Sequence, residues 1–201
     1  MIAPLLAIRP LPQPEPDLTG VTALAFTSPN GVAAFAALSP DRSHPVLAVG
    51  DATAAAAIDQ GFTDVASAAG DLIALAGLIR AQNFPADAVV LNIGAREPAG
   101  DLAQAVGPAP TVRRLPVYEA METDIPTPDA CAAVLIHSPR AGRALAARLA
   151  ATAGAPGLFC IAISEAAAAP LTARSVTAVH AAPHPDEDSL LGTLGKAVSP
   201  V

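Results

Sequence analysis

Two Ser-Pro pairs occupy equivalent positions in the sequence, each between an apolar run and an Ala-rich run. Ser28-Pro29-Asn30 follows Leu24 to Thr27, and Ser138-Pro139-Arg140 follows Val134 to His137. Ser is a favoured N-cap residue, and Pro suits the first position of a helix because its missing N–H would have no partner there. Each pair therefore predicts the end of a strand and the start of a helix, where free backbone N–H groups can bind an anion.

Two further turns repeat this arrangement at the next strand ends. They are Gly50-Asp51-Ala52-Thr53 and Ser164-Glu165-Ala166, and each opens an Ala-rich segment. Plain helix capping is the simpler interpretation of any one of these turns. Because ligands of open α/β sheets bind beyond the carboxyl ends of the strands, the repetition favours a shared site. Four helix starts that face one cleft would suit a ligand with several negative charges.

Tyr118 and His137 are the polar side chains that could add chemistry to such a cleft. Tyr118 is the only tyrosine, and its phenol could donate a hydrogen bond, although a packing role is equally compatible with the sequence. His137 precedes Ser138 and faces the cleft only if it is not a structural histidine. The sequence has no metal-ligand spacing, Gly-x-Ser-x-Gly motif, glycine-rich phosphate loop or paired-carboxylate motif. We therefore expect neither metal nor cofactor.

Composition restricts the partners and the compartment. The net charge is -7 and Lys196 is the only lysine, which argues against nucleic acid and anionic membranes as partners. The longest uncharged apolar run, 149–164, is interrupted by glycine and proline and is too short to span a bilayer. Cys131 and Cys160 lie in apolar runs without redox or metal spacing, so buried reduced thiols are expected. A cytoplasmic monomer is the expectation.

Strand-like runs alternate with Ala-rich helical runs along the whole chain, which is typical of βαβ units on parallel sheets. The expected strands are 22–28, 46–50, 64–69, 88–95, 111–118, 131–138, 158–164 and 175–182. They are short and rich in Val, Leu and Ile, as expected where helices cover both faces of a sheet. The fold class is therefore α/β.

An internal repeat predicts two similar flavodoxin-like lobes. Residues 24–29, 47–52 and 65–68 align in order with residues 134–139, 161–166 and 176–182. The domains expected are a linker strand at 1–16, a contiguous lobe at 17–112, a second linker strand at 113–128 and a second lobe at 129–201. The two linker strands would pair as a β-ladder that joins the lobes. The second lobe is expected to lack an N-terminal strand and helix, because the opening Pro4 to Pro10 reads like the end of such a unit.

Four segments in this order resemble the uroporphyrinogen-III synthase family. They are Phe26 to Val32, Val49 to Thr53, Leu115 to Tyr118 and His137 to Pro139, and the resemblance covers essentially the whole chain. It implies a two-lobed fold joined by a β-ladder, no cofactor, and hydroxymethylbilane as substrate. That linear tetrapyrrole would lose its terminal hydroxyl and close with ring D inverted, giving uroporphyrinogen III in haem biosynthesis.

The resemblance also assigns roles to individual residues. Tyr118 matches the tyrosine that assists departure of the hydroxyl as a proton donor. The substrate-binding residues expected are Thr27, Ser28, Pro29, Asn30, Gly50, Asp51, Thr53, His137, Ser138 and Ser164. Two departures stand out, because the chain lacks the family's opening Thr-Arg-Pro strand and carries Ala166-Ala167 where many members have Thr. The alternative is therefore a non-catalytic, synthase-like binder of an anionic tetrapyrrole or another small anion.

Overall fold

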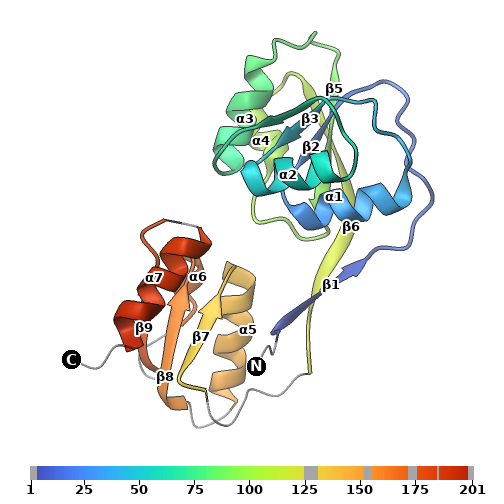
Figure 1. Cartoon of the computed structure of the whole chain (residues 1–201). Helices are drawn as coiled ribbons and strands as arrows, with labels where there is room; N and C mark the ends of the chain where they lie inside the picture. Colours follow the sequence, from blue (N-terminus) through green and yellow to red (C-terminus); the bar gives the residue numbers. More distant parts are fainter. Residues whose placement is uncertain (1–3, 125–130, 152–154, 172–175, 185, 199–201) are drawn as a thin grey trace. The chain divides into compact units, whose positions relative to one another are not determined.

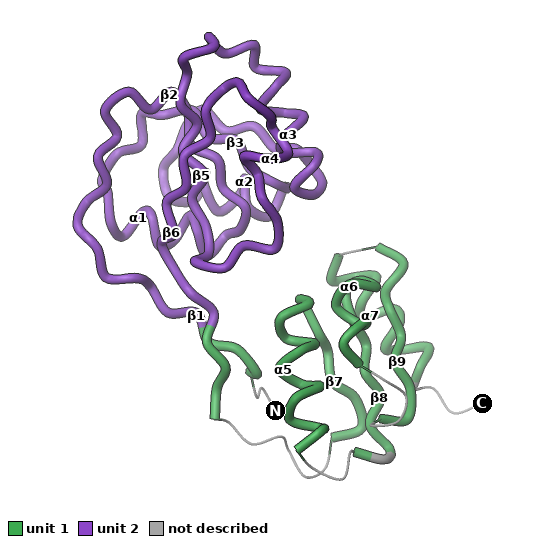
Figure 2. Tube along the Cα trace, turned by 180° about the vertical axis from the view of Figure 1, so that it is seen from behind, with its two compact units in different colours: residues 1–7, 121–201 green, residues 8–120 purple. Residues whose placement is uncertain are grey.

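The computed structural model describes residues 4–124, 131–151, 155–171, 176–184 and 186–198 (Figure 1). The chain divides into two compact units, one of residues 8–120 and one of residues 1–7 with 121–201 (Figure 2). The polypeptide passes from one unit to the other twice, and both passages fall inside the ranges 1–16 and 113–128.

The 8–120 unit is built on a six-stranded sheet in the order β1-β6-β5-β2-β3-β4. Its strands are β1 (Leu6–Pro10), β2 (Val21–Phe26), β3 (Val46–Ala48), β4 (Val65–Ser67), β5 (Val89–Ala95) and β6 (Thr111–Glu122). Strands β2 to β6 pair in parallel. Strand β1 runs antiparallel to β6, because the hydrogen-bond partners move in opposite directions, from Thr123 N–H to Leu5 O and from Leu11 N–H to Val117 O.

Four helices lie between these strands in the sequence: α1 (Pro29–Leu38), α2 (Asp51–Asp59), α3 (Leu72–Ala81) and α4 (Leu102–Val106). Alternate residues of β2 face different helices, since side chains of a strand point to opposite faces of the sheet. Leu24 and Phe26 pack with Phe35 of α1, whereas Ala23 and Ala25 pack with Leu75 of α3. Both faces of the central strands are thus covered, which explains why β2 and β5 are apolar without alternation.

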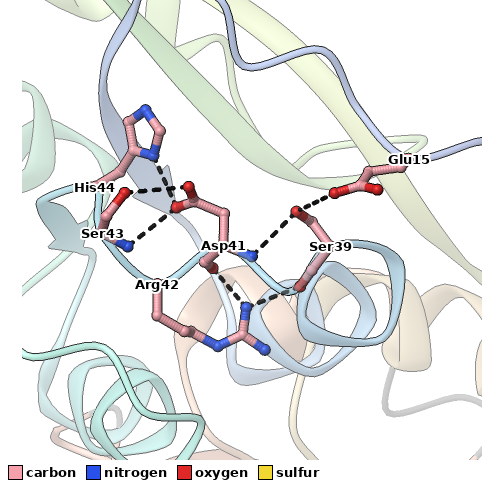
Figure 3. A network of polar contacts seen from close by, with 6 residues as sticks. All are labelled: Glu15, Ser39, Asp41, Arg42, Ser43 and His44. Carbon is pink, nitrogen blue, oxygen red and sulfur yellow. Dashed lines mark hydrogen bonds and ion pairs between the residues drawn. The ribbon is translucent and has the colours of Figure 1, made fainter.

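A network of hydrogen bonds and ion pairs lies at the C-terminal end of α1 and in the loop that follows this helix (Figure 3). Ser39 ends α1 and donates its hydroxyl to Glu15 at 3.0 Å. Arg42 donates to the carbonyls of Ser39 and Gln60, at 2.8 and 2.6 Å, so one guanidinium satisfies the ends of α1 and α2. Its guanidinium also lies 5.0 Å from the centre of the buried Phe62 ring.

Asp41 belongs to the same network and is the acceptor for His44 and Ser43. Its carboxylate is 2.8 Å from His44 Nδ1 and accepts from the Ser43 N–H and hydroxyl, both at 3.1 Å. Partial burial acts to raise the pKa of Asp41, but the hydrogen bonds from His44 and Ser43 together hold it below its ordinary value. The network therefore fixes the loop 39–44 against the segment that leads from β1 to β2.

The other unit contains the three-stranded parallel sheet β7-β8-β9. Its elements are β7 (Ala133–Ile136), α5 (Pro139–Ala150), β8 (Ala155–Ala162), α6 (Glu165–Ala168), β9 (Val176–Ala181) and α7 (Glu187–Val198). Ile136 and Cys160 pack with Leu145 of α5 on one face, whereas Ile161 packs with Leu190 of α7 on the other. Gly142 permits close packing of α5 on α6, because a Cβ there would lie 2.3 Å from Ala167 O.

Candidate active site

The strand order of the 8–120 unit creates a switch point between β2 and β5. From these two central neighbours the chain continues outward in opposite directions, to β3 and β4 on one side and to β6 on the other. Ligands of open α/β sheets bind at such a point, beyond the carboxyl ends of the strands. Thr27 lies there, directly after β2, and a Cβ at Gly94 of β5 would be 2.8 Å from its hydroxyl oxygen. A glycine at 94 is therefore what leaves room for the Thr27 side chain.

Ser28 is the N-cap of α1 at this switch point. Its backbone is extended, its Oγ accepts from the Gly31 N–H at 3.1 Å, and Pro29 follows at the start of the helix. This is the local structure that Ser-Pro predicts. Pro29 and Asn30 are exposed in the first turn, where Pro29 has no N–H and the N–H groups of Gly31 and Val32 bond to Ser28, so Asn30 supplies the N–H that can bind a ligand.

A β-bulge turns Tyr118 toward this cap. Gly94 pairs with Pro116 but Ala95 pairs with Tyr118, so β6 has one extra residue, Val117, at this point. Leu115 packs on the α1 face, and the extra residue brings Tyr118 to the same face three positions later. Without the bulge, residues three apart on a strand would point to opposite faces.

The Tyr118 hydroxyl lies 2.9 Å from Ser28 Oγ, and either oxygen can be the donor. Tyr118 is buried, with 8% of the residue's surface exposed. A phenol held against an N-cap serine is well placed to share or pass a proton, because the serine oxygen is itself polarised by the Gly31 N–H that it accepts. The structure thus joins the two residues that the sequence named for catalysis and substrate contact in this unit.

The turn after β3 differs from the Ser28 turn in two ways. Gly50 is the N-cap of α2 and makes no side-chain cap bond, while the Asp51 carboxylate accepts from Ser67 Oγ at 2.6 Å. An aspartate in the first turn already satisfies the positive end of a helix. Thr53 is buried, with 2% of its surface exposed, and its N–H bonds to Gly50 O.

Sequence reasoning missed an ion-pair ladder beside Tyr118. Glu119 accepts from Arg9 Nε at 2.9 Å, also contacts Arg9 Nη2, and accepts from Arg96 Nη1 at 2.7 Å. The Arg96 N–H donates to Tyr118 O at 2.7 Å, which ties this ladder to the tyrosine's own backbone. No local sequence signal marks the ladder, because Arg9 and Glu119 are 110 residues apart in the chain.

The second unit presents its own capped helix starts. Ser138 caps α5 by accepting from the Ala141 N–H at 3.1 Å, and Ser164 caps α6 by accepting from the Ala167 N–H at 3.3 Å. His137 is exposed at the end of β7, where its Nε2 lies 3.0 Å from a Glu187 carboxylate oxygen. The histidine thus has an acidic partner at the start of α7 and is not a buried structural residue.

Within the described ranges, no three His, Cys, Asp or Glu side chains are grouped so that they could hold a metal ion. In the same part of the chain no helix is both long and apolar enough to cross a membrane.

The fold is that of an α/β protein with a mixed, mostly parallel sheet and a second parallel sheet, each with capped helix starts at its carboxyl edge. The family model of uroporphyrinogen-III synthase HemD matches residues 1–192, and the chain belongs to this family. This membership makes it an enzyme of haem biosynthesis and confirms the resemblance seen in the sequence. Nothing in the comparisons favours the non-catalytic alternative.

Solved structures show the same fold. The uroporphyrinogen-III synthetase of Helicobacter pylori 26695 superposes with a TM-score of 0.70 at 20% identity, covering 98% of this chain and 95% of that one. A mutant uroporphyrinogen III synthase of the extremely thermophilic bacterium Thermus thermophilus gives a TM-score of 0.58 at 16% identity, covering 98% and 88%. No curated protein matches the chain in sequence. The predicted α/β fold class is confirmed by these structural matches.

Proposed function

We propose that this protein is a uroporphyrinogen-III synthase that cyclises hydroxymethylbilane to uroporphyrinogen III with inversion of ring D and loss of water. The reaction class is that of a hydro-lyase. Family membership supports the proposal, and the contact of 2.9 Å between Tyr118 OH and Ser28 Oγ is the structural observation that carries it. Catalysis would need no metal and no cofactor, and we further propose that the protein acts as a cytoplasmic monomer.

Tyr118 is the proton donor in this proposal. Its phenol gives a proton to the hydroxyl of hydroxymethylbilane, the carbon–oxygen bond breaks, and water departs, so that ring A becomes an azafulvenium cation and Tyr118 a phenolate. Ring D attacks through its substituted carbon, and the resulting spiro compound fragments and recloses with that ring inverted. The phenolate recovers a proton when the pyrrole regains its aromaticity, so one water is lost overall. Burial of the ring beside Ser28 keeps bulk water from competing for that proton.

Binding energy holds the flexible chain in the one conformation that leads to the inverted product. We propose that the substrate's carboxylates are bound by helix starts, since backbone N–H groups there bind anions in a protein of any net charge. In the exposed first turn of α1 the N–H of Asn30 is the ready candidate, since Pro29 has no N–H, and Thr27 lies beside this turn. The Asp51 side chain would repel a carboxylate, so this turn contributes the backbone at Gly50, and the buried Thr53 supports the turn through its N–H bond to Gly50 O. In the second unit the proposed contacts are Ser138, Ser164 and His137.

The test is product analysis with freshly prepared hydroxymethylbilane. The substrate cyclises by itself to the type I isomer, which keeps ring D in its original orientation. After oxidation, chromatography of the porphyrins separates the type I and type III isomers. The proposal predicts type III product that scales with protein added. Exclusive formation of type I at the spontaneous rate would reject it.

A further inference from the structure

The exposed end of the β1-β6-β5 edge carries more positive charge than its own carboxylate neutralises. Arg9 and Arg96 both contact Glu119, and Arg114 lies next to them, donating from Nη2 to Arg96 O at 3.1 Å. The chain has only 11 Lys and Arg residues and a net charge of -7. Two arginines paired with one glutamate leave one positive charge over in this group, in a protein that is acidic as a whole.

The guanidinium groups keep hydrogen-bond capacity after binding Glu119. An arginine has five N–H donors, and the contacts with Glu119 use two nitrogens of Arg9 and one of Arg96. The side chains of Arg9 and Arg96 are 62% and 57% exposed, whereas that of Glu119 is 14% exposed. Both arginine side chains are thus largely exposed to solvent, whereas the Glu119 side chain is mostly covered.

The position of the ladder connects it to the proposed active site. Arg96 directly follows β5, at the carboxyl edge of the parallel strands, and its N–H binds Tyr118 O at 2.7 Å. Arg114 fixes this backbone further by donating to the carbonyls of Ala95 and Arg96. The Arg96 end of the ladder therefore lies at the carboxyl edge of the sheet, beside the backbone of Tyr118.

We propose that Arg9 and Arg96 form a carboxylate clamp that binds an acetate or propionate group of the substrate in competition with Glu119, which pairs with both guanidinium groups in the free protein. The inference rests on the proposed function for the identity of the substrate. Planar guanidinium groups bind carboxylates in a bidentate manner, which fits a substrate with eight of them. Arg114 acts as a positioning residue, because its contacts are to backbone carbonyls at the end of β5.

Three substitutions separate a clamp from a purely structural ladder. Arg9→Ala and Arg96→Ala each remove a donor set, and we expect KM for hydroxymethylbilane to rise about fivefold to tenfold with a much smaller change in kcat. Glu119→Gln breaks both ion pairs but leaves the arginines and removes a competing negative charge. It should therefore lower KM or leave it unchanged. If the ion pairs serve only to hold β1 against β6, Glu119→Gln should lower the unfolding free energy at least as much as Arg9→Ala does.

Arg143→Ala is the matched control. Arg143 lies exposed on α5, away from the ladder in the sequence, and its loss changes the net charge by the same amount. We expect KM to stay within about twofold for this variant, because only general electrostatic attraction is lost. Thermal unfolding of each variant, followed by circular dichroism, verifies that the compared proteins are folded. If Arg9→Ala fails to fold, Arg96→Ala and Glu119→Gln still decide the question.

A binding measurement keeps the clamp and the proposed function distinguishable. Uroporphyrin III, a stable fluorescent octacarboxylate, is titrated against each protein, and the affinity should fall about fivefold to tenfold in Arg9→Ala and Arg96→Ala. A wild-type protein that forms type III product while both arginine variants keep normal KM and affinity would overturn the clamp alone. A wild type that forms no type III product would overturn the proposed function, and the porphyrin titration would then decide the clamp. Equal competition by inorganic phosphate at the same charge concentration would show unspecific anion binding and reject a carboxylate clamp.

Discussion

Replacing Tyr118 with Phe removes one oxygen from the Tyr118–Ser28 pair and leaves the buried ring in place. The lost hydrogen bond of 2.9 Å is partly buried, so its removal should cost about 1 kcal/mol of unfolding free energy. Ser28 keeps its bond to the Gly31 N–H, so the start of α1 should survive. The expected decrease in melting temperature is about 2–5 °C.

The catalytic effect should be much larger than the structural one. Loss of a general acid typically lowers the rate about 10²-fold to 10⁴-fold, which corresponds to roughly 3–5 kcal/mol in activation free energy. This exceeds the stability cost severalfold, so the two roles of Tyr118 are separable in one variant. The assay is kcat for type III product, with chemical denaturation of the same preparation as the measure of stability.

Ser28→Ala provides the comparison. It breaks the same Tyr118–Ser28 bond and also deletes the N-cap of α1, so it should destabilise the protein more than Tyr118→Phe does, by about 1–2 kcal/mol in all. Its principal kinetic effect should be on KM, because the proton donor remains. If Tyr118→Phe turns over within about threefold of wild type, the tyrosine has only a packing role and the proposed proton transfer is wrong.

Three further predictions concern the scaffold. Gly142→Ala should destabilise the second unit by about 1–3 kcal/mol or more, since the new Cβ would lie 2.3 Å from Ala167 O. Gly192→Ala on α7 is the contrast: a Cβ there has no atom within 4 Å, so urea unfolding should show a stabilisation of about 0.5–1 kcal/mol. Asp71→Ala should cost about 1 kcal/mol by removing the cap that accepts from the Ile73 and Ala74 N–H groups, and an unchanged urea midpoint would contradict this. Burial, reinforced by Cys131, raises the pKa of the Cys160 thiol from 9.0 to about 11, so the folded state keeps a proton that the unfolded chain releases. The stability that this thiol contributes is fully present below pH 9 and is lost as the pH rises toward 11. Between these pH values the unfolding free energy of Cys160→Ala should therefore fall by about 1–3 kcal/mol less than that of wild type. If the unfolding free energies of the two proteins fall in parallel with pH, the pKa of Cys160 is not raised.

The elements were predictable because hydrophobic pattern and capping residues act locally. The expected strand 22–28 overlaps β2, which spans Val21–Phe26, and the Ser-Pro pairs mark the starts of α1 and α5 as observed. Strand ends were less accurate. The expected strand 158–164 begins at Ala155 in the structure and ends at Ala162, because Ile163 and Ser164 already belong to the turn that caps α6.

The geometry of the site depends on contacts that no local pattern encodes. Counting residues along β6 would place Leu115 and Tyr118 on opposite faces, and only the bulge at Val117 brings both to the α1 face. The Arg9–Glu119 pair likewise arises from the antiparallel register of β1 with β6. Burial of Thr53 follows from its position on the inner side of α2, which the short Gly-Asp-Ala-Thr motif does not reveal.

The most direct test of the account is the fraction of type III isomer formed from hydroxymethylbilane as the protein concentration is raised. We predict that this fraction increases from the spontaneous background toward complete type III product, and that Tyr118→Phe needs at least about a hundredfold more protein to reach the same value. If the fraction stays at the background at every concentration of folded protein, the chain does not impose the ring-inverting conformation and the central claim is wrong.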